Sequence, residues 1–152
     1  MKTALYSVAA LVIFVLLSLA VLSMFSRQQP LLGLRSGKLL PCPETPNCVC
    51  SEAAGLASSI APIAVNAEPQ AALEHLKSVL KQQGGEIITE SENYLRLSFS
   101  TRIFRFVDDL ELRLDFPNKL IHVRSASRVG HSDLDANRLR VEAIRAAFES
   151  NS

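Results

Sequence analysis

The longest apolar segment of the chain lies near its N-terminus, where Ala4–Phe25 contains no charged residue. At about 1.5 Å per residue, a helix of this length is roughly 33 Å long, which matches the hydrocarbon core of a bilayer. A cleavable signal peptide is the rival interpretation, but its apolar region has only about 7–15 residues and small residues at the cut. Because this run is longer and Ser23-Met24-Phe25-Ser26 lacks a small-x-small site, we expect residues 1–26 to form an uncleaved single-pass membrane anchor.

Polar residues, proline and glycine dominate directly after this segment. We expect residues 27–40 to form a tether, followed by a domain over residues 41–150. Three prolines within residues 41–46 remove backbone donors, so the proline-rich stretch 41–51 is expected to be irregular.

Two later segments have the periodicity of amphipathic helices. The first has leucines three and four residues apart, namely Leu73, Leu76 and Leu80. Asn66 is expected to cap its start and Gly84-Gly85 to end it. The second is expected over residues 133–149, with Ser132 or Asp133 as its cap.

Alternating apolar and polar residues predict strands between the two helices. Besides a short edge strand at 60–65, the candidates are residues 86–90, 94–100, part of 104–116, and 120–127. The last two of these strands must turn their apolar residues to the same core. These residues have even numbers in the first strand (Leu110, Leu112 and Leu114) and odd numbers in the second (Ile121 and Val123), so the loop between the strands has an even number of residues. Proline excludes the primed two-residue turns and favours a four-residue loop at Phe116–Lys119. The resulting pairs are Leu112 with Val123, Leu114 with Ile121, Glu111 with Arg124, and Asp108 with Ser127.

This order of elements, a short strand, a helix, four strands and a second helix, predicts an α+β domain. We expect one mainly antiparallel sheet of four to five strands, with both helices packed on its apolar face. No internal repeat is visible in the sequence.

The charge of the chain is nearly balanced, with 16 Lys and Arg against 15 Asp and Glu. With Lys2 set aside, fifteen of each remain, which gives no reason to expect a nucleic-acid partner. The charges that flank the apolar segment are also close to balance. Lys2 and the amino terminus face Arg27, Arg35 and Lys38, which leans slightly toward a cytoplasmic domain.

Two polar motifs stand apart from the hydrophobic pattern. Pro41–Ser51 has the form Pro-Cys-Pro-x-x-Pro-Asn-Cys-Val-x-Ser, and Arg124–Glu142 has the form Arg-Ser-Ala-Ser-Arg-Val-Gly-x-Ser-Asp-Leu-x-x-Asn-Arg-x-Arg-Val-Glu. With Asp108-Asp109 between them, they resemble a family known only as a domain of unknown function (DUF 1499), from Leu40 to about Phe148. The family has no established activity to carry over. By this resemblance the pattern residues are Cys42, Pro43, Pro46, Asn47, Cys48, Ser51, Asp109, Arg124, Ser125, Ser127, Arg128, Gly130, Asp133, Asn137, Arg138, Arg140 and Glu142.

Two positions depart from this pattern. Cys50 stands where the family usually has serine, and Asp135 stands where glycine is common. Because the family usually has serine at position 50, we do not expect Cys50 to take part in any chemistry that the family shares.

The other two cysteines, Cys42 and Cys48, lie close together in the proline-rich stretch. A structural disulfide is the plainest interpretation and needs an oxidising compartment. A zinc site needs about four ligands, which the three cysteines and His131 would supply only by a coincidence of folding. A nucleophilic cysteine needs a nearby base and a lowered pKa. We expect no metal and no cofactor. We expect a Cys42–Cys48 disulfide, and because that bond needs an oxidising compartment, a domain on the periplasmic side of the membrane.

The second motif also supplies candidate ligand-binding residues, which are Arg124, Ser127, Arg128, Asp133, Asn137, Arg138 and Arg140. Arginine forks suit carboxylate or phosphate. Candidates to enclose an anion are therefore Arg124, Arg128 and Arg138, with Ser127 as a neutral donor. The alternative is that the same residues form ordinary ion pairs within the fold, and this interpretation is the stronger of the two.

No Gly-x-Ser-x-Gly elbow or nucleophile–base–orienter pattern is present, so we assign no catalytic residue. We expect an envelope domain, anchored through residues 4–25, that binds a protein partner or a small anion without catalysing a reaction. One alternative is an enzyme that uses Cys48, His131 or the Asp108-Asp109 pair. The other is a structural subunit of an assembly.

Overall fold

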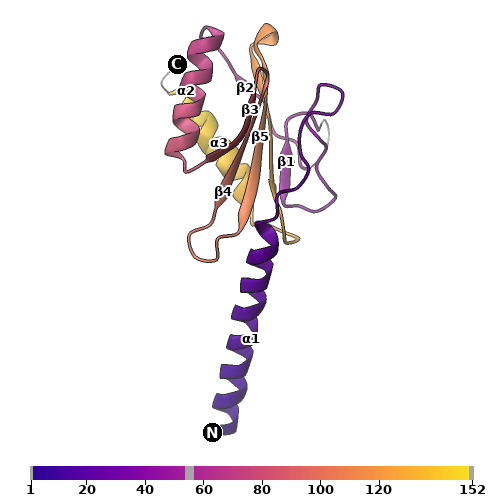
Figure 1. The fold of residues 1–152 in the computed structure, drawn as a ribbon, viewed down its shortest axis with the longest axis vertical. Coiled ribbons are helices and arrows are strands. Elements are labelled where there is room, and N and C mark those ends of the chain that lie inside the picture. The colour runs from indigo at the N-terminus through magenta and orange to yellow at the C-terminus, as the bar shows by residue number, and fades with distance from the viewer. Residues whose placement is uncertain (1, 54–56, 151–152) are drawn as a thin grey trace.

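The computed structural model describes residues 2–53 and 57–150. Its first element is α1 (Lys2–Ser26), which projects from one end of the domain (Figure 1). The side chains of α1 are largely exposed. Ser18 and Leu19 are half-buried, and Ser23 and Ser26 are buried where the helix meets the domain. Among the described residues, α1 is the one helix long and apolar enough to cross a membrane.

The domain is built on one antiparallel sheet of six strands, which confirms the α+β class. The strands are β1 (Cys48–Cys50), β2 (Ile63–Ala64), β3 (Glu86–Ser91), β4 (Tyr94–Ser100), β5 (Val107–Asp115) and β6 (Leu120–Ser127). Their order is β1-β6-β5-β4-β3, and β2 pairs with the other half of β6. The expectation that residues 41–51 are irregular is wrong for β1. This strand begins after the last proline of the stretch, Pro46, where backbone donors are again available for pairing.

The register of the two longest strands is the predicted one. Strands β5 and β6 pair Leu112 with Val123, Leu114 with Ile121, Glu111 with Arg124, and Asp108 with Ser127. Asp115 pairs with Leu120, so the connection is the four-residue loop Phe116–Lys119. A short 3₁₀ helix, η1 (Phe116–Asn118), fills the loop, and Lys119 closes it with φ of 55°.

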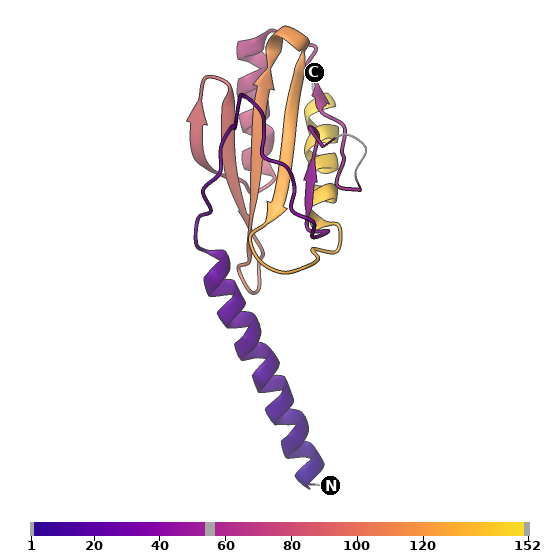
Figure 2. The same cartoon turned by 90° about the vertical axis from the view of Figure 1, so that its right-hand side faces the viewer.

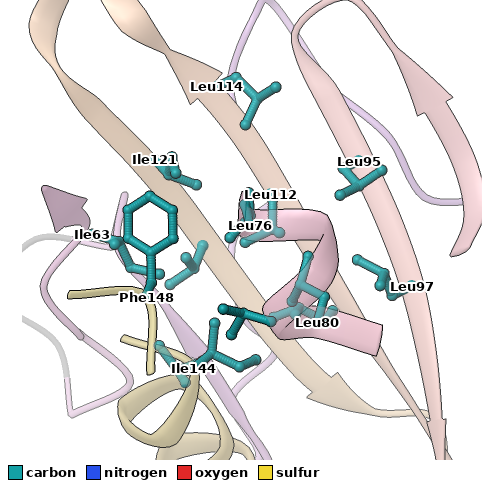
Figure 3. Close-up of a cluster of buried hydrophobic side chains, with 14 of the residues drawn as sticks. Ile63, Leu76, Leu80, Leu95, Leu97, Leu112, Leu114, Ile121, Ile144 and Phe148 are labelled. Atoms are coloured by element: carbon teal, nitrogen blue, oxygen red, sulfur yellow. The ribbon is translucent and has the colours of Figure 1, made fainter. Parts of the chain in front are cut away.

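Two helices, α2 (Pro69–Gln82) and α3 (Ala136–Glu149), cover the apolar face of the sheet. Figure 3 shows the core between them, where Leu76 and Leu80 of α2 and Ile144 and Phe148 of α3 meet side chains of the sheet. Burial of this face is the main source of stability, at about 25 cal/mol per Å² of apolar surface.

The helix boundaries differ in part from those expected. Glu68, and not Asn66, directly precedes α2. The second helix begins at Ala136 and not near residue 133, because Leu134 and Asp135 have φ of 54° and 64°, which no right-handed helix contains. At the end of α2, Gly84 has the expected positive φ of 87°. Gly85 is required for another reason, since a Cβ there would lie 2.8 Å from Phe99 Cζ.

The opposite, outer face of the sheet is also covered. The segment after α1 runs along this face before it turns back to β1 (Figure 2). Leu39 is buried there against Cys50 and Tyr94, and its backbone N–H donates to Glu52 Oε2 at 2.7 Å. The tether segment therefore shields from water a face that carries charged side chains.

Candidate functional site

The residues of the second motif divide between the two faces of the sheet. Successive side chains of a strand point to opposite faces, and this places Arg124 on the outer face and Ser125 and Ser127 on the inner one. Asp108 and Asp109 are divided in the same way, so they do not form one paired-carboxylate site.

The outer network is centred on Asp109, whose side chain is only 2% exposed. Arg96 donates Nε and Nη2 to Oδ1, at 3.1 and 2.9 Å. Arg128 forms a bidentate ion pair with the same carboxylate, in which Nε donates to Oδ2 at 2.7 Å and Nη2 donates to Oδ1 at 2.8 Å. Charged hydrogen bonds of this geometry are the strong class, and they compensate the cost of burying the carboxylate.

Arg128 also contacts the end of α1. Its third nitrogen, Nη1, donates to the carbonyl oxygens of Ser26 at 3.2 Å and of Arg27 and Gln28 at 3.4 Å. The last carbonyls of a helix lack partners within the helix and carry the negative end of its dipole, so a guanidinium is well suited to this position. One side chain thus joins the apolar helix to the centre of the sheet.

Two serines complete this junction. Ser26 Oγ accepts the backbone N–H of Val107 at 3.2 Å and donates to the carbonyl of Ser23 at 2.7 Å. The Ser23 hydroxyl donates to the carbonyl of Phe104, in the loop between β4 and β5. The end of α1 is therefore attached to β5 and to the loop before it.

A second carboxylate of the outer face, Glu111, is fully buried. It accepts Arg124 Nη1 at 2.8 Å, the Tyr94 hydroxyl at 2.7 Å and the backbone N–H of Gly33, in the tether segment, at 3.2 Å. Burial and the hydrogen bond to Glu111 raise the pKa of Tyr94 well above its usual range, so this hydroxyl remains a donor. The predicted Glu111–Arg124 pair thus also fixes the tether segment.

The inner network is centred on Asn137, which is 1% exposed. Its Nδ2 donates to the carbonyl of Asn47 at 3.0 Å, to Ser127 Oγ at 3.0 Å and to Asp133 Oδ2 at 2.7 Å. Its Oδ1 accepts Ser125 Oγ and Arg140 Nη1, both at 2.6 Å. Asn137 therefore connects α3, β6 and the proline-rich loop.

Arg140 extends this network to β5. Its Nη2 donates to Asp108 Oδ2 at 2.5 Å, and its guanidinium lies 4.8 Å from the centre of the Phe99 ring. Asn47 closes the other side by donating Nδ2 to the carbonyl of Gly130 at 2.7 Å. The two sequence motifs, far apart along the chain, meet here.

A groove of about 600 Å³ lies beside the proline-rich loop. It is lined from three segments, residues 42–49, 57–58 and 133–138. Its ionisable residues are Glu44, Asp133, Asp135 and Arg138. Arg138 donates Nη1 to the carbonyl of Ser59 at 3.0 Å and Nη2 to that of Ala57 at 2.9 Å, so both terminal nitrogens of its fork have partners.

The cysteines have the predicted arrangement. Cys42 and Cys48 form a disulfide at the groove, with a Cα–Cα distance of 5.6 Å. Cys50 is free and buried, and burial raises the pKa of its thiol. Within residues 2–53 and 57–150, no group of three or more His, Cys, Asp and Glu is placed to hold a metal ion. His131 is exposed in the loop before α3.

The structure brings together four of the predicted ligand-binding residues, which are Ser127, Asp133, Asn137 and Arg140. It places Arg124 and Arg128 on the outer face of the sheet and Arg138 against the 57–59 backbone, so the three arginines of the predicted anion site contact separate partners. Asp135, where the family often has glycine, adopts the left-handed conformation that glycine reaches at least cost.

Sequence reasoning missed Arg96 and Ser26 as members of the outer network. Arg96 alternates with buried leucines in β4, a pattern that is typical of a strand with one face in water. The sequence does contain a signal for this network. Arg96 of β4 and the carboxylates Asp109 and Glu111 of β5 fall on the same face of neighbouring strands, where opposite charges can pair.

These features define a class: a small α+β domain that carries an N-terminal apolar helix, a disulfide-closed loop and two buried polar networks. The chain belongs to the family described as protein of unknown function (DUF1499), whose model matches residues 38–148. No curated protein matches the chain. The matched residues include both motifs and most of both networks, whereas α1 and Ser26 lie before them.

We expect Asn137→Ala to lower the free energy of unfolding by about 2–4 kcal/mol, because it leaves several buried hydrogen-bonding groups unpaired. Chemical denaturation of the purified protein measures the change. The matched control is Leu139→Ala on the same helix, whose side chain is exposed, with an expected change within about 0.5 kcal/mol. Equal effects of the two substitutions would show that the inner network does not hold α3 to the sheet.

Proposed function

We propose that this protein is a membrane-anchored, non-enzymatic binding domain that faces the extracytoplasmic side and holds a protein partner in the groove beside its disulfide. The observation that carries this proposal is the contact of Arg128 with both Asp109 and the end of α1. A domain attached in this way is presented at a fixed angle to the membrane. A fixed angle benefits recognition, because less orientational freedom is lost when the partner binds.

Anchoring is supported by the apolarity and exposure of α1. The helix has no charged residue after Lys2, almost all of its side chains lie outside the domain, and its length suits a bilayer. Polar groups at the end of the helix have partners in the domain: the Ser26 carbonyl accepts a hydrogen bond from Arg128, and the Ser26 hydroxyl accepts one from the Val107 N–H.

The extracytoplasmic orientation is supported by the Cys42–Cys48 disulfide. Structural disulfides persist in oxidising compartments such as the periplasm and are rare in the cytosol. The charges that flank α1 are nearly balanced and oppose this orientation only weakly.

The groove is the best-supported binding surface. Its ionisable lining consists of three carboxylates and Arg138, whose fork already donates to two carbonyls. Charge complementarity therefore favours a basic segment of a partner protein over a small anion. The other three arginines of this motif support the same choice, because each already pairs with a carboxylate at 2.5–2.8 Å.

Orientation is tested by alkylating protein taken directly from cells before any reduction, followed by peptide mapping without reductant. The alkylation is done in denaturant, because Cys50 is buried in the folded domain. We expect a linked Cys42–Cys48 peptide pair and alkylation of Cys50 alone, because only Cys50 is a free thiol. Alkylation of all three cysteines would contradict both the bond in the cell and the proposed orientation.

The groove is tested by reversing its charge with Glu44→Lys and Asp135→Asn together. We expect recovery of a cross-linked partner from solubilised membranes to fall at least about tenfold, since opposite charges at a specific interface become like charges. Glu92→Lys, in the exposed turn between β3 and β4, is the matched control and should recover the partner as the parent protein does. Equal loss in both variants, or equal recovery in both, would contradict the groove as the binding surface.

A further inference from the structure

The loop between β4 and β5 is closed by hydrogen bonds at its base and exposes both arginine and apolar side chains. Thr101 closes it at both ends, because its N–H donates to the carbonyl of Phe106 at 2.9 Å and its hydroxyl accepts the N–H of Phe106 at 3.0 Å. Between these bonds, Ile103 is 84% exposed and lies between two exposed or half-buried neighbours, Arg102 and Phe104. Arg105 is also exposed and has a φ of 56°.

The depth of this loop relative to α1 is set by a hydrogen bond. The Ser23 hydroxyl donates to the Phe104 carbonyl. Ser23 lies within the last turn of α1, and two exposed apolar residues, Met24 and Phe25, follow it. The tip is therefore level with the end of the apolar helix, at the end of the domain from which α1 projects (Figures 1 and 2).

We propose that the loop Thr101–Phe106 is a second membrane contact, in which Ile103 enters the interfacial layer and Arg102 and Arg105 bind phospholipid phosphates. The proposal rests on the proposed anchoring through α1. A bilayer that ends at Phe25 has its head groups at the level of this loop, where apolar side chains and arginines are both accommodated. The arginines are attracted by the negative charge of anionic lipids.

The small size of this contact is compatible with binding because α1 makes the contact intramolecular. One aliphatic residue and two arginines would bind a membrane weakly alone, but a tethered loop has a high effective concentration at the surface. The segment between β6 and α3 lies at the same end of the domain (Figures 1 and 2) and contains Leu134, which is 89% exposed. With the 101–106 loop and this segment both touching the bilayer beside α1, the bilayer itself restricts the rotation and tilt of the domain.

Tryptophan fluorescence offers a direct test, because the chain contains no tryptophan and each substitution reports one position. The full chain is reconstituted in vesicles of phosphatidylethanolamine and phosphatidylglycerol that contain brominated phosphatidylcholine. We expect Ile103→Trp to show blue-shifted emission and about a twofold loss of intensity with bromines near the head groups, as for an interfacial side chain. Emission that is red-shifted and unquenched, or blue-shifted and unquenched as in a protein contact, would overturn the proposal.

Three further variants separate the possible failures. Leu11→Trp, in the middle of α1, should be quenched by bromines deep in the bilayer, and Glu92→Trp, at the other end of β4, should not be quenched at all. Quenching at position 11 without quenching at position 103 would refute the second contact and leave the anchor intact, whereas quenching at neither would refute both. Arg102→Glu with Arg105→Glu should reduce the quenching of Ile103→Trp to near the level of Glu92→Trp, and unchanged quenching would remove the arginines from the proposal.

Discussion

The structure depends on the burial of one carboxylate, Asp109, in the outer face of the sheet. A buried charge is costly unless it is paired, and removal of one partner leaves that cost uncompensated. Asp109 has two arginine partners, Arg96 from β4 and Arg128 from the end of β6. Because Arg128 also donates to the carbonyls at the end of α1, the apolar helix, the sheet and the tether segment that covers this face are stabilised together.

The second motif, Arg124–Glu142, begins within β6 and serves both faces of the sheet because strand side chains alternate. Arg124 and Arg128 point outward to Glu111 and Asp109, whereas Ser125 and Ser127 point inward to Asn137. The inner network fixes α3 and the proline-rich loop, and so it shapes the groove that lies between them. The position of the apolar helix and the shape of the proposed binding surface therefore depend on neighbouring residues at the end of β6 and directly after it.

Much of this architecture could be predicted from the sequence. The register of β5 and β6 followed from two constraints: buried Leu112 and Val123 must share a face, and the turn must lie around Pro117. The start of α3 could not be predicted, because left-handed conformations at Leu134 and Asp135 are local choices that periodicity does not record. The outer network was missed for a related reason. Charged residues in an alternating strand usually face water, but here the tether segment covers them.

The central claim is that Arg128 fixes the orientation of the domain relative to α1. Spin labels at Leu11→Cys and Glu92→Cys, in a Cys50→Ala background that keeps the disulfide, report the distance between helix and domain in lipid nanodiscs. The parent should give one narrow distance distribution, and Arg128→Gln should broaden it while the domain stays folded, because Asp109 keeps Arg96 as a partner. Arg138→Gln removes an arginine of the same motif whose fork donates to carbonyls of the 57–59 segment, and it should leave the distribution narrow. A distribution that is broad in the parent, or equally narrow in Arg128→Gln, would contradict the account.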